Sequence, residues 1–356
     1  MNDRNAELKS LGWSGWFARR TALEPKEVVA RVAAVDRDGL LLVDQTGFFR
    51  GRLSGSYRHR HHLAHQRPCV GDWVRLEKPA ADGPGTVHGL VTRRTALRRK
   101  AAGEAVEYQM IAANLDIVVI VQSCRFDFNR KRLERYLVMV REGGAEPWIM
   151  LTKTDLVESA VLAAQVEEIR SAGITAPVIS LSNVTGEGVD ALRSLLEPGK
   201  TYCFVGSSGV GKSTLINRLI RREIQETRAV SGTGEGRHTT VRRELIRLEN
   251  GALVIDNPGM REFGIVGAEE GMEAGFPDIA ARAVHCRYRD CGHGGEPGCA
   301  VIAAVKSGEI RREHYENFLK LRSESEFHDM SYTEKRKKDK DFGKYIKSAK
   351  KSLQRK

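Results

Sequence analysis

Short apolar segments separated by turns fill the first third of the chain. Four of them have strand length and are separated by turn signals such as Asp38-Gly39 and Thr46-Gly47, at residues 28–35, 40–43, 48–53 and 72–76. Several short strands within about 70 residues are typical of a small β-barrel. The pattern therefore predicts an all-β barrel that resembles the oligonucleotide-binding (OB) type.

The pattern changes from about residue 105 onward. Apolar runs of strand length now alternate with amphipathic stretches of helix length. The predicted strands are 115–121, 148–151, 177–181, 201–205 and 253–255, and the predicted helices are 130–142, 157–172, 189–196 and 212–222. Such alternation predicts an α/β domain with a mostly parallel sheet covered by helices.

The loop after the strand at 201–205 reads GSSGVGKST and fits the phosphate-binding pattern GxxxxGK[ST]. In that setting the backbone N–H groups and a helix N-terminus face an anion, so a chance match in a Gly-rich loop is the weaker alternative. Lys212 is predicted to reach the β- and γ-phosphates and to act in catalysis, and Ser213 to bind Mg²⁺. The predicted contacts are Gly206, Ser207, Ser208, Gly209, Val210, Gly211, Lys212, Ser213 and Thr214.

The segment TKTD after the strand at 148–151 resembles the guanine-specificity motif NKxD. Its carboxylate, Asp155, can accept hydrogen bonds from guanine N1–H and the exocyclic amine, which adenine does not offer. Alone, the segment could equally be an ordinary strand-to-helix cap, but it gains weight beside a phosphate loop. The predicted base contacts are Thr152, Lys153, Thr154 and Asp155, followed by Ser182 and Asn183 after the next strand.

Asp256-Asn257-Pro258-Gly259 follows the strand at 253–255 and fits DxxG. Asp256 is predicted to hold Mg²⁺ through water, and the Gly259 N–H to sense the γ-phosphate. Gly236-Arg237-His238-Thr239-Thr240 fits switch I, where Thr239 or Thr240 would complete the magnesium shell. The guanine motif precedes the phosphate loop here, whereas ordinary GTPases have it last. The sequence therefore predicts a circularly permuted GTPase.

Met260 stands where many GTPases have a water-orienting Gln. A thioether cannot orient water usefully, so we predict slow intrinsic hydrolysis or a water-orienting group from elsewhere. His238 is the candidate, because imidazole titrates near neutral pH and lies next to the switch threonines. The alternatives are a loop histidine without a catalytic role, and Arg237 as a charge-stabilising group.

Three of the six cysteines cluster with a histidine in the pattern C-x4-C-x-H-x5-C. Three thiolates and one imidazole suit a tetrahedral Zn²⁺, and four protein ligands leave no open position. The sequence therefore predicts a structural zinc ion on Cys286, Cys291, His293 and Cys299, with free cysteines in a flexible loop as the alternative. Helices from about residue 300 and over 309–323 are expected to surround it. The remaining cysteines, Cys69, Cys124 and Cys203, are expected in the core.

The 356 residues carry a formal net charge of +12, and 8 of these charges fall in the tail from Ser331 onward. Such a tail is typical of a polyanion partner or of a solvated disordered end. The barrel region is also basic and contains Phe48, Phe49, Tyr57 and Trp73. These aromatics would stack on RNA bases, or they would be barrel core beneath a solvated basic face. A metal on the histidines of residues 59–65 is disfavoured, because they lack an ordered ligand spacing.

These motifs together resemble the ribosome small-subunit-dependent GTPase A (RsgA) family over about residues 27–325, including GDWV at residues 71–74. The resemblance implies an N-terminal OB barrel, a circularly permuted GTPase and a zinc domain. It also implies a role in late 30S maturation through 16S rRNA, GTP hydrolysis stimulated by the 30S subunit, and release of another assembly factor. Thr152 departs from the Asn of the common motif, which would weaken base affinity.

We therefore expect a multi-domain chain: an N-terminal extension (1–25), an OB-like RNA-binding barrel (26–100), a permuted GTPase (101–266), a mostly helical zinc domain (267–330) and a basic tail (331–356). With no apolar window near the ~18 residues of a membrane span and no signal pattern, we expect a cytoplasmic monomer without a membrane partner. Two other functions stay open. One is an RNA-binding scaffold in which hydrolysis is incidental, and the other is a P-loop ATPase or nucleotide kinase.

Overall fold

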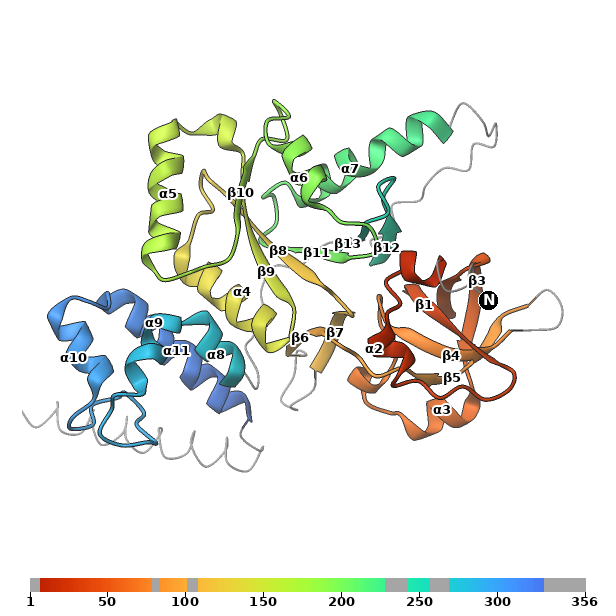
Figure 1. Cartoon of the computed structure of the whole chain (residues 1–356), viewed down its shortest axis with the longest axis horizontal. Coiled ribbons are helices and arrows are strands. Elements are labelled where there is room, and N and C mark those ends of the chain that lie inside the picture. The colour runs from red at the N-terminus through yellow and green to blue at the C-terminus, as the bar shows by residue number, and fades with distance from the viewer. Residues whose placement is uncertain (1–6, 79–82, 101–107, 228–242, 257–268, 330–356) are drawn as a thin grey trace, which may run out of the picture.

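The computed structural model describes residues 7–78, 83–100, 108–227, 243–256 and 269–329 (Figure 1). A β-barrel, an α/β domain and a group of helices follow one another along the chain. No helix among these residues has both the length and the apolar character needed to cross a membrane.

Five strands form the N-terminal barrel, and two short helices lie beside it. The strands are β1 (Glu27–Asp36), β2 (Gly39–Asp44), β3 (Gly47–Leu53), β4 (Trp73–Glu77) and β5 (Gly85–Leu90), and the helices are α3 (Gly55–Arg60) and η1 (Ala64–Gln66). Their order is β1-β2-β3-β5-β4, and β4 pairs again with β1, which closes the barrel. Val32, Leu42, Leu76 and Val87 are fully buried in its core. The sequence predicted four of these strands and missed β5.

The N-terminal segment, whose docking the sequence left undecided, packs on the barrel. It contains the short helix α2 (Gly15–Ala18). The Trp13 ring meets the Trp73 ring edge-on with centroids 4.8 Å apart, and Phe17 is 1% exposed. Trp73 is 0% and Tyr57 3% exposed, so neither can stack on an RNA base. For these two aromatics the expectation of base stacking was wrong, and the core alternative is correct.

A short hairpin leads from the barrel into the α/β domain. Strands β6 (Ala96–Lys100) and β7 (Tyr108–Ala113) pair antiparallel, and the predicted domain boundary at residue 100 falls between them. The buried side chain of Arg31 connects the N-terminal segment, the barrel and the residues that follow this hairpin. Its guanidinium donates hydrogen bonds to the carbonyl oxygens of Leu11 (2.5 Å), Gly71 (3.2 Å) and Asn114 (3.1 Å).

The α/β domain has six strands in the order β10-β9-β8-β11-β13-β12, and only β12 is antiparallel to its neighbour. The strands are β8 (Ile117–Ser123), β9 (Glu146–Thr152), β10 (Val178–Leu181), β11 (Thr201–Val205), β12 (Glu244–Arg247) and β13 (Leu253–Asp256). The helices are α4 (Arg130–Glu142), η2 (Thr154–Leu156), α5 (Ser159–Ser171), α6 (Val189–Leu195) and α7 (Lys212–Thr227).

The side chains of alternate residues of β8 point to opposite faces of this sheet. Val118 and Ile120 pack with α4 and α5 residues, whereas Val119 and Val121 pack with those of α6 and α7. Successive strand residues point to opposite faces, so a strand covered on both sides is apolar throughout. All seven residues of β8 are buried, and the first five, Ile117 to Val121, are apolar. Strand β12 also pairs with barrel strand β1 at Ala34 and Glu244, so one hydrogen-bonded sheet runs through both parts.

Between residues 269 and 329, the described range of the C-terminal part, the structure has four helices: α8 (Glu269–Gly275), α9 (Pro277–Ala283), α10 (Ala300–Ser307) and α11 (Arg312–Asp329). The sequence predicted α10 and α11 and missed the other two. The group packs on α4, where Arg135 and Glu324 form a bidentate ion pair of 2.5 and 2.7 Å. Buried His314 bonds Glu134 of α4 through Nδ1 (2.8 Å) and Asp278 of α9 through Nε2 (3.0 Å).

Candidate nucleotide site and metal centre

The carboxyl ends of the parallel strands bring the predicted phosphate loop and guanine motif together. Strand β11 ends at Val205 directly before Gly206, β9 ends at Thr152, and β10 ends at Leu181 directly before Ser182. In open parallel sheets, ligands bind at this edge. The structure thus places segments that are about 50 residues apart in the sequence on one site.

Two glycines of the phosphate loop are required by its close contacts. Gly206 has φ +145°, and a Cβ there would lie 2.2 Å from the Val121 carbonyl oxygen of β8. Gly211 has φ +100°, and a Cβ there would lie 2.8 Å from Asn183 Nδ2. Only glycine allows the loop to curl this tightly against the neighbouring strand ends.

Hydrogen bonds connect the phosphate loop to both parts of the guanine motif. Thr152 Oγ1 donates to the Val210 carbonyl (2.6 Å) and Asn183 Nδ2 to the Gly211 carbonyl (3.0 Å). Thr152 is 0% exposed. Its hydroxyl, predicted as a base contact, is thus used inside the protein to hold the two loops together.

Asp155, the predicted guanine acceptor, is held by its neighbours. Its Oδ1 accepts a hydrogen bond from Ser182 Oγ, and Ser182 Oγ in turn accepts the backbone N–H groups of Val184 and Thr185, both at 3.1 Å. Lys153 before it has a left-handed backbone with φ 58°. The carboxylate therefore has a fixed orientation before any ligand arrives, which lowers the entropic cost of binding.

Lys212 folds back over the phosphate loop. Its Nζ donates to the carbonyl oxygens of Gly206 (2.8 Å) and Ser207 (2.6 Å). Burial lowers the pKa of Lys212, and the carboxylates of Asp127 and Asp256 act in the opposite direction. The amine is thus beside the loop that the sequence assigns to phosphate, with the predicted magnesium residue Asp256 close enough to interact. The predicted magnesium ligand Ser213, like Thr214, is exposed at the start of α7.

Several predicted residues lie outside the part of the chain that the structure describes. These are the switch I residues Arg237, His238, Thr239 and Thr240, and Gly259 and Met260 of the DxxG segment. The expectations for them stay predictions.

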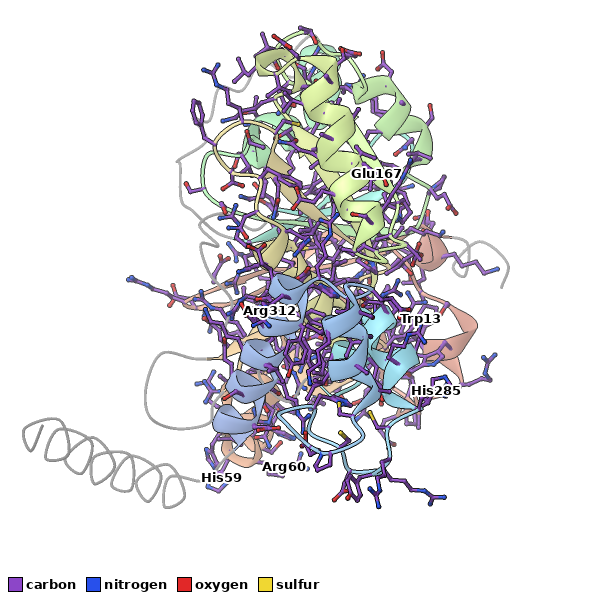
Figure 2. All side chains as sticks on the ribbon, turned by 90° about the vertical axis from the view of Figure 1, so that its left-hand side faces the viewer. Trp13, His59, Arg60, Glu167, His285 and Arg312 are labelled. Atoms are coloured by element: carbon purple, nitrogen blue, oxygen red, sulfur yellow. The ribbon has the colours of Figure 1, made fainter. Side chains whose placement is uncertain are left out.

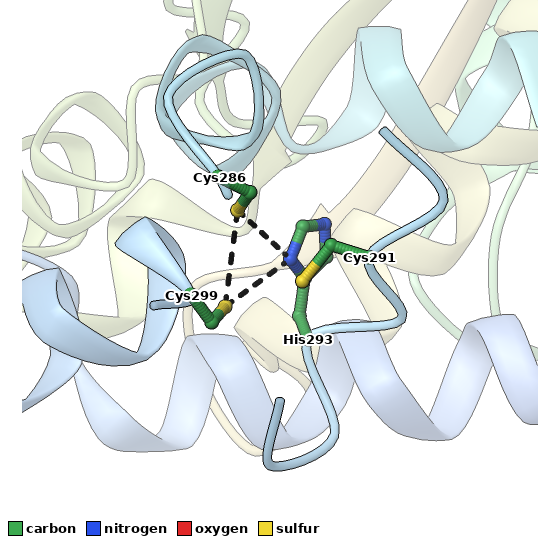
Figure 3. Close-up of side chains that lie close together, drawn as sticks. All are labelled: Cys286, Cys291, His293 and Cys299. Atoms are coloured by element: carbon green, nitrogen blue, oxygen red, sulfur yellow. Dashed lines mark hydrogen bonds between the residues drawn. The ribbon is translucent and has the colours of Figure 1, made fainter. Parts of the chain in front are cut away.

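The four predicted zinc ligands come together at one point (Figure 3). Their Sγ and Nδ1 or Nε2 atoms all lie within 4.8 Å of one another. Cys286 Sγ and Cys299 Sγ are 3.9 Å apart, and His293 Nδ1 lies 3.6 and 3.4 Å from them. Bonds of about 2.3 Å to sulfur in a tetrahedron place two sulfurs about 3.8 Å apart. The donor set therefore fits zinc in both kind and spacing.

Neighbouring helices hold this cluster in place. Cys299 caps α10, since its Sγ accepts the Ile302 N–H at 3.5 Å. From α11, Tyr315 donates its hydroxyl to the His293 carbonyl, and Arg322 donates to the Gly292 carbonyl at 2.8 Å. His293 has φ 56°, a conformation that these bonds help to maintain. Such bonds fix the orientation of ligands around a metal.

Comparison with known proteins agrees with this geometry. Residues 90–266 match the family model described as RsgA GTPase. A protein of Opitutus terrae called "Small ribosomal subunit biogenesis GTPase RsgA" is 40% identical over 334 residues, which covers 90% of each chain. The chain belongs to the RsgA GTPase family. It is accordingly a GTP hydrolase.

Solved structures show the fold of this RsgA GTPase independently. YjeQ from Thermotoga maritima matches with a TM-score of 0.63 and 26% identity, over 83% of this chain and 97% of that one. YloQ, described as a circularly permuted GTPase, matches with a TM-score of 0.61 and 26% identity, over 88% of this chain and all of that one. Both agree with the permuted motif order read from the sequence.

Two residues around the nucleotide site of this RsgA GTPase were missed by sequence reasoning. Asp127 follows β8 and acts electrostatically on Lys212. It is a polar residue soon after a buried strand of the parallel sheet, and that position could have marked it. Arg218 of α7 donates to the Asn183 carbonyl at 2.6 Å, and nothing in the local sequence marks that contact.

Proposed function

We propose that this chain binds the 30S ribosomal subunit through 16S rRNA, assists late small-subunit maturation, and hydrolyses GTP slowly until the 30S subunit stimulates it. The observation that supports a guanine-specific site is the hydrogen-bonded connection of Thr152 and Asn183 to the phosphate loop. The relatives' name, which refers to small ribosomal subunit biogenesis, supports the partner.

In this proposal Asp155 accepts guanine N1–H and the exocyclic amine, while the Asn183 segment lies at the base O6. The loop from Gly206 to Thr214 surrounds the phosphates with Lys212 at the β- and γ-positions. Ser213 and Asp256, with Thr239 or Thr240, would hold Mg²⁺. The ion would offset negative charge on the β- and γ-phosphates. His238 would orient the attacking water, and Gly259 would sense the γ-phosphate.

The zinc ion belongs to the proposal as a structural element. Its four proposed ligands leave no coordination position for a substrate. The cluster would therefore stiffen the helices that pack on α4 of the GTPase.

The test of the partner is GTP hydrolysis by the purified chain alone, with 30S subunits, and with 50S subunits as control. A slow basal rate that rises many-fold with 30S and not with 50S supports the proposal. Equal rates in all three mixtures would contradict it and favour an RNA-binding scaffold in which hydrolysis is incidental.

The test of guanine specificity uses Asp155→Asn. An amide at this position donates to a base carbonyl where the carboxylate accepted from the guanine amine, so the variant should lose GTP affinity and gain affinity for xanthosine triphosphate. Asp190→Asn, an exposed carboxylate on α6, is the matched control. If Asp155→Asn binds GTP as the parent does, Asp155 does not read the base.

A further inference from the structure

A pocket lies on the barrel between helix α3 and strands β4 and β5. Its volume is about 340 Å³, within the range of small-ligand sites. Its polar lining consists of Tyr57, Arg60, His61, Gln66, Arg75 and His88. In the view of Figure 2, the labelled Arg60 and its neighbour His59 lie toward the lower edge of the molecule.

The lining is basic and contains no carboxylate. Arg60 is exposed, and its Nε donates to the Ser56 carbonyl oxygen at 3.3 Å. It has no ion pair with any residue in the described part of the chain, so its two terminal nitrogens are available to a ligand. Arg75 is half-buried, and its guanidinium forms an ion pair with Glu27 at 2.9 Å. The cation available to a ligand is therefore Arg60, and a guanidinium favours a phosphate.

A second basic pocket, beside the β6–β7 hairpin, differs in this respect. Its arginines are each matched by a carboxylate: Arg93 by Asp72 at 2.8 Å, Arg94 by Asp116, and Arg98 by Glu142 at 3.6 Å. In the α3 pocket Arg75 is matched by Glu27 in the same way, but Arg60 has no carboxylate partner among the described residues. The α3 pocket is therefore the better phosphate site.

One wall of the α3 pocket carries an acceptor as well. The His61 ring stacks on Tyr57 with centroids 4.1 Å apart and 19° between the planes. His61 Nδ1 lies 3.0 Å from the Tyr57 carbonyl oxygen. A carbonyl only accepts, so Nδ1 carries a proton, and in that tautomer Nε2 is an acceptor. A ribose 2′-hydroxyl is a donor that distinguishes RNA from DNA.

We propose that this pocket binds one ribonucleotide of an RNA strand, with its phosphate on Arg60 and its 2′-hydroxyl on His61 Nε2. This inference refines the proposed RNA partner and rests on it. It requires no base stacking on Trp73 or Tyr57, because both rings are buried.

The test measures binding of the full chain to an unstructured RNA and to DNA of the same sequence, each about 12 nucleotides long, within the site size of such barrels. Arg60→Glu should weaken both about tenfold and lower the salt slope by about 0.7, the value for one phosphate contact on a single strand. Arg37→Glu, the same charge change at an exposed position in the β1–β2 turn, is the control and should change binding less than twofold.

A second variant tests the 2′-hydroxyl contact. His61→Phe keeps a ring to stack on Tyr57 and removes Nε2, so RNA affinity should fall to that of DNA while DNA affinity stays unchanged. Equal losses for Arg60→Glu and Arg37→Glu, or an unchanged RNA preference in His61→Phe, would overturn the proposal.

A third binding experiment uses free nucleotide or phosphate in place of RNA. If guanosine monophosphate or inorganic phosphate binds in an Arg60-dependent manner while RNA binding ignores Arg60, the pocket is a small-anion site and not an RNA site. This assay contains no ribosome. A chain that fails to respond to 30S subunits but passes the oligonucleotide test therefore contradicts the proposed function and leaves the pocket assignment intact.

Discussion

The hydroxyl of Thr152 donates a 2.6 Å hydrogen bond to the carbonyl oxygen of Val210, and this bond connects the end of β9 to the middle of the phosphate loop. The same hydroxyl lies 3.2 Å from the Gln122 carbonyl of β8. A fully buried side chain thus sets the distance between the segment predicted to read the base and the segment predicted to hold the phosphates.

Thr152→Val should weaken nucleotide binding, because it leaves the Val210 carbonyl without its partner and loosens the loop. The loss of one such bond is worth about 1 kcal/mol, or roughly fivefold in affinity. Titration with fluorescent GDP measures it. Thr152→Ser, which keeps the hydroxyl, should bind within about twofold of the parent. Parent-like affinity in Thr152→Val would show that the bond does not support the site.

Removing the metal should unfold the C-terminal helices while the GTPase stays folded. The four ligands come from one segment of 14 residues and meet at one point, and structural zinc contributes directly to folding energy. The chain should contain one zinc per molecule by mass spectrometry, and Cys286→Ser should lose it together with part of the helical circular dichroism. Cys124→Ala, a buried cysteine outside the cluster, should keep the metal. Full zinc content in Cys286→Ser would contradict the ligand set.

Stability should fall between about pH 6.5 and pH 9 through His314. Burial lowers the pKa of this histidine, but its hydrogen bonds to Asp278 and Glu134 outweigh burial and raise the pKa to about 9. The folded pKa is above the unfolded value of about 6.5, so the contribution is complete below pH 6.5 and is lost as the pH rises through 9. At 1.36 kcal/mol per unit the shift corresponds to about 3 kcal/mol.

His314→Gln isolates this contribution. The difference in unfolding free energy between parent and variant, measured by urea denaturation at several pH values, should be largest at pH 6 and shrink toward pH 10. A constant difference would mean that the histidine acts only through packing and neutral hydrogen bonds.

Arg31→Met should destabilise the junction between the N-terminal segment, the barrel and the β7–β8 connection. The Gly71 carbonyl keeps a hydrogen bond from Asn114 Nδ2 at 3.1 Å, but the buried carbonyl oxygens of Leu11 and Asn114 lose their donor. We expect a cost of about 2 kcal/mol or more. Thermal unfolding and the rate of proteolysis before residue 25 both report the effect. Arg52→Met, an exposed arginine on β3, should change neither. Unchanged proteolysis in Arg31→Met would show that the segment is held by its aromatic contacts alone.

The sequence predicted elements and ligands most accurately where nearby residues alone determine the local structure. Helix α4 begins after Asn129, whose side chain accepts the Arg132 N–H, and its predicted bounds of 130–142 match the structure. The strand before the phosphate loop, β11, also matches its predicted bounds. The zinc ligands were located by spacing alone, and the structure brings all four together.

Contacts between distant segments could not be read in this way. Helices α8 and α9 are seven residues each, and α8 packs on α4, so their local sequence carries little signal. Aromatic residues look alike in sequence whether they are core or surface, which is why Trp73 was misjudged. The partners of His314 are 36 and 180 residues away, and no local pattern connects them.

The pairing of Ala34 with Glu244 places strand β12 between the sheet of the barrel and the sheet of the α/β domain. The strand comes immediately after the segment that contains the predicted switch I, and its other edge pairs with β13, whose last residue is Asp256. β12 is only four residues long. One strand of four residues therefore connects the barrel sheet, through β1, to the strand that ends in the predicted magnesium carboxylate. A displacement of β12 would consequently be felt by both parts of the sheet.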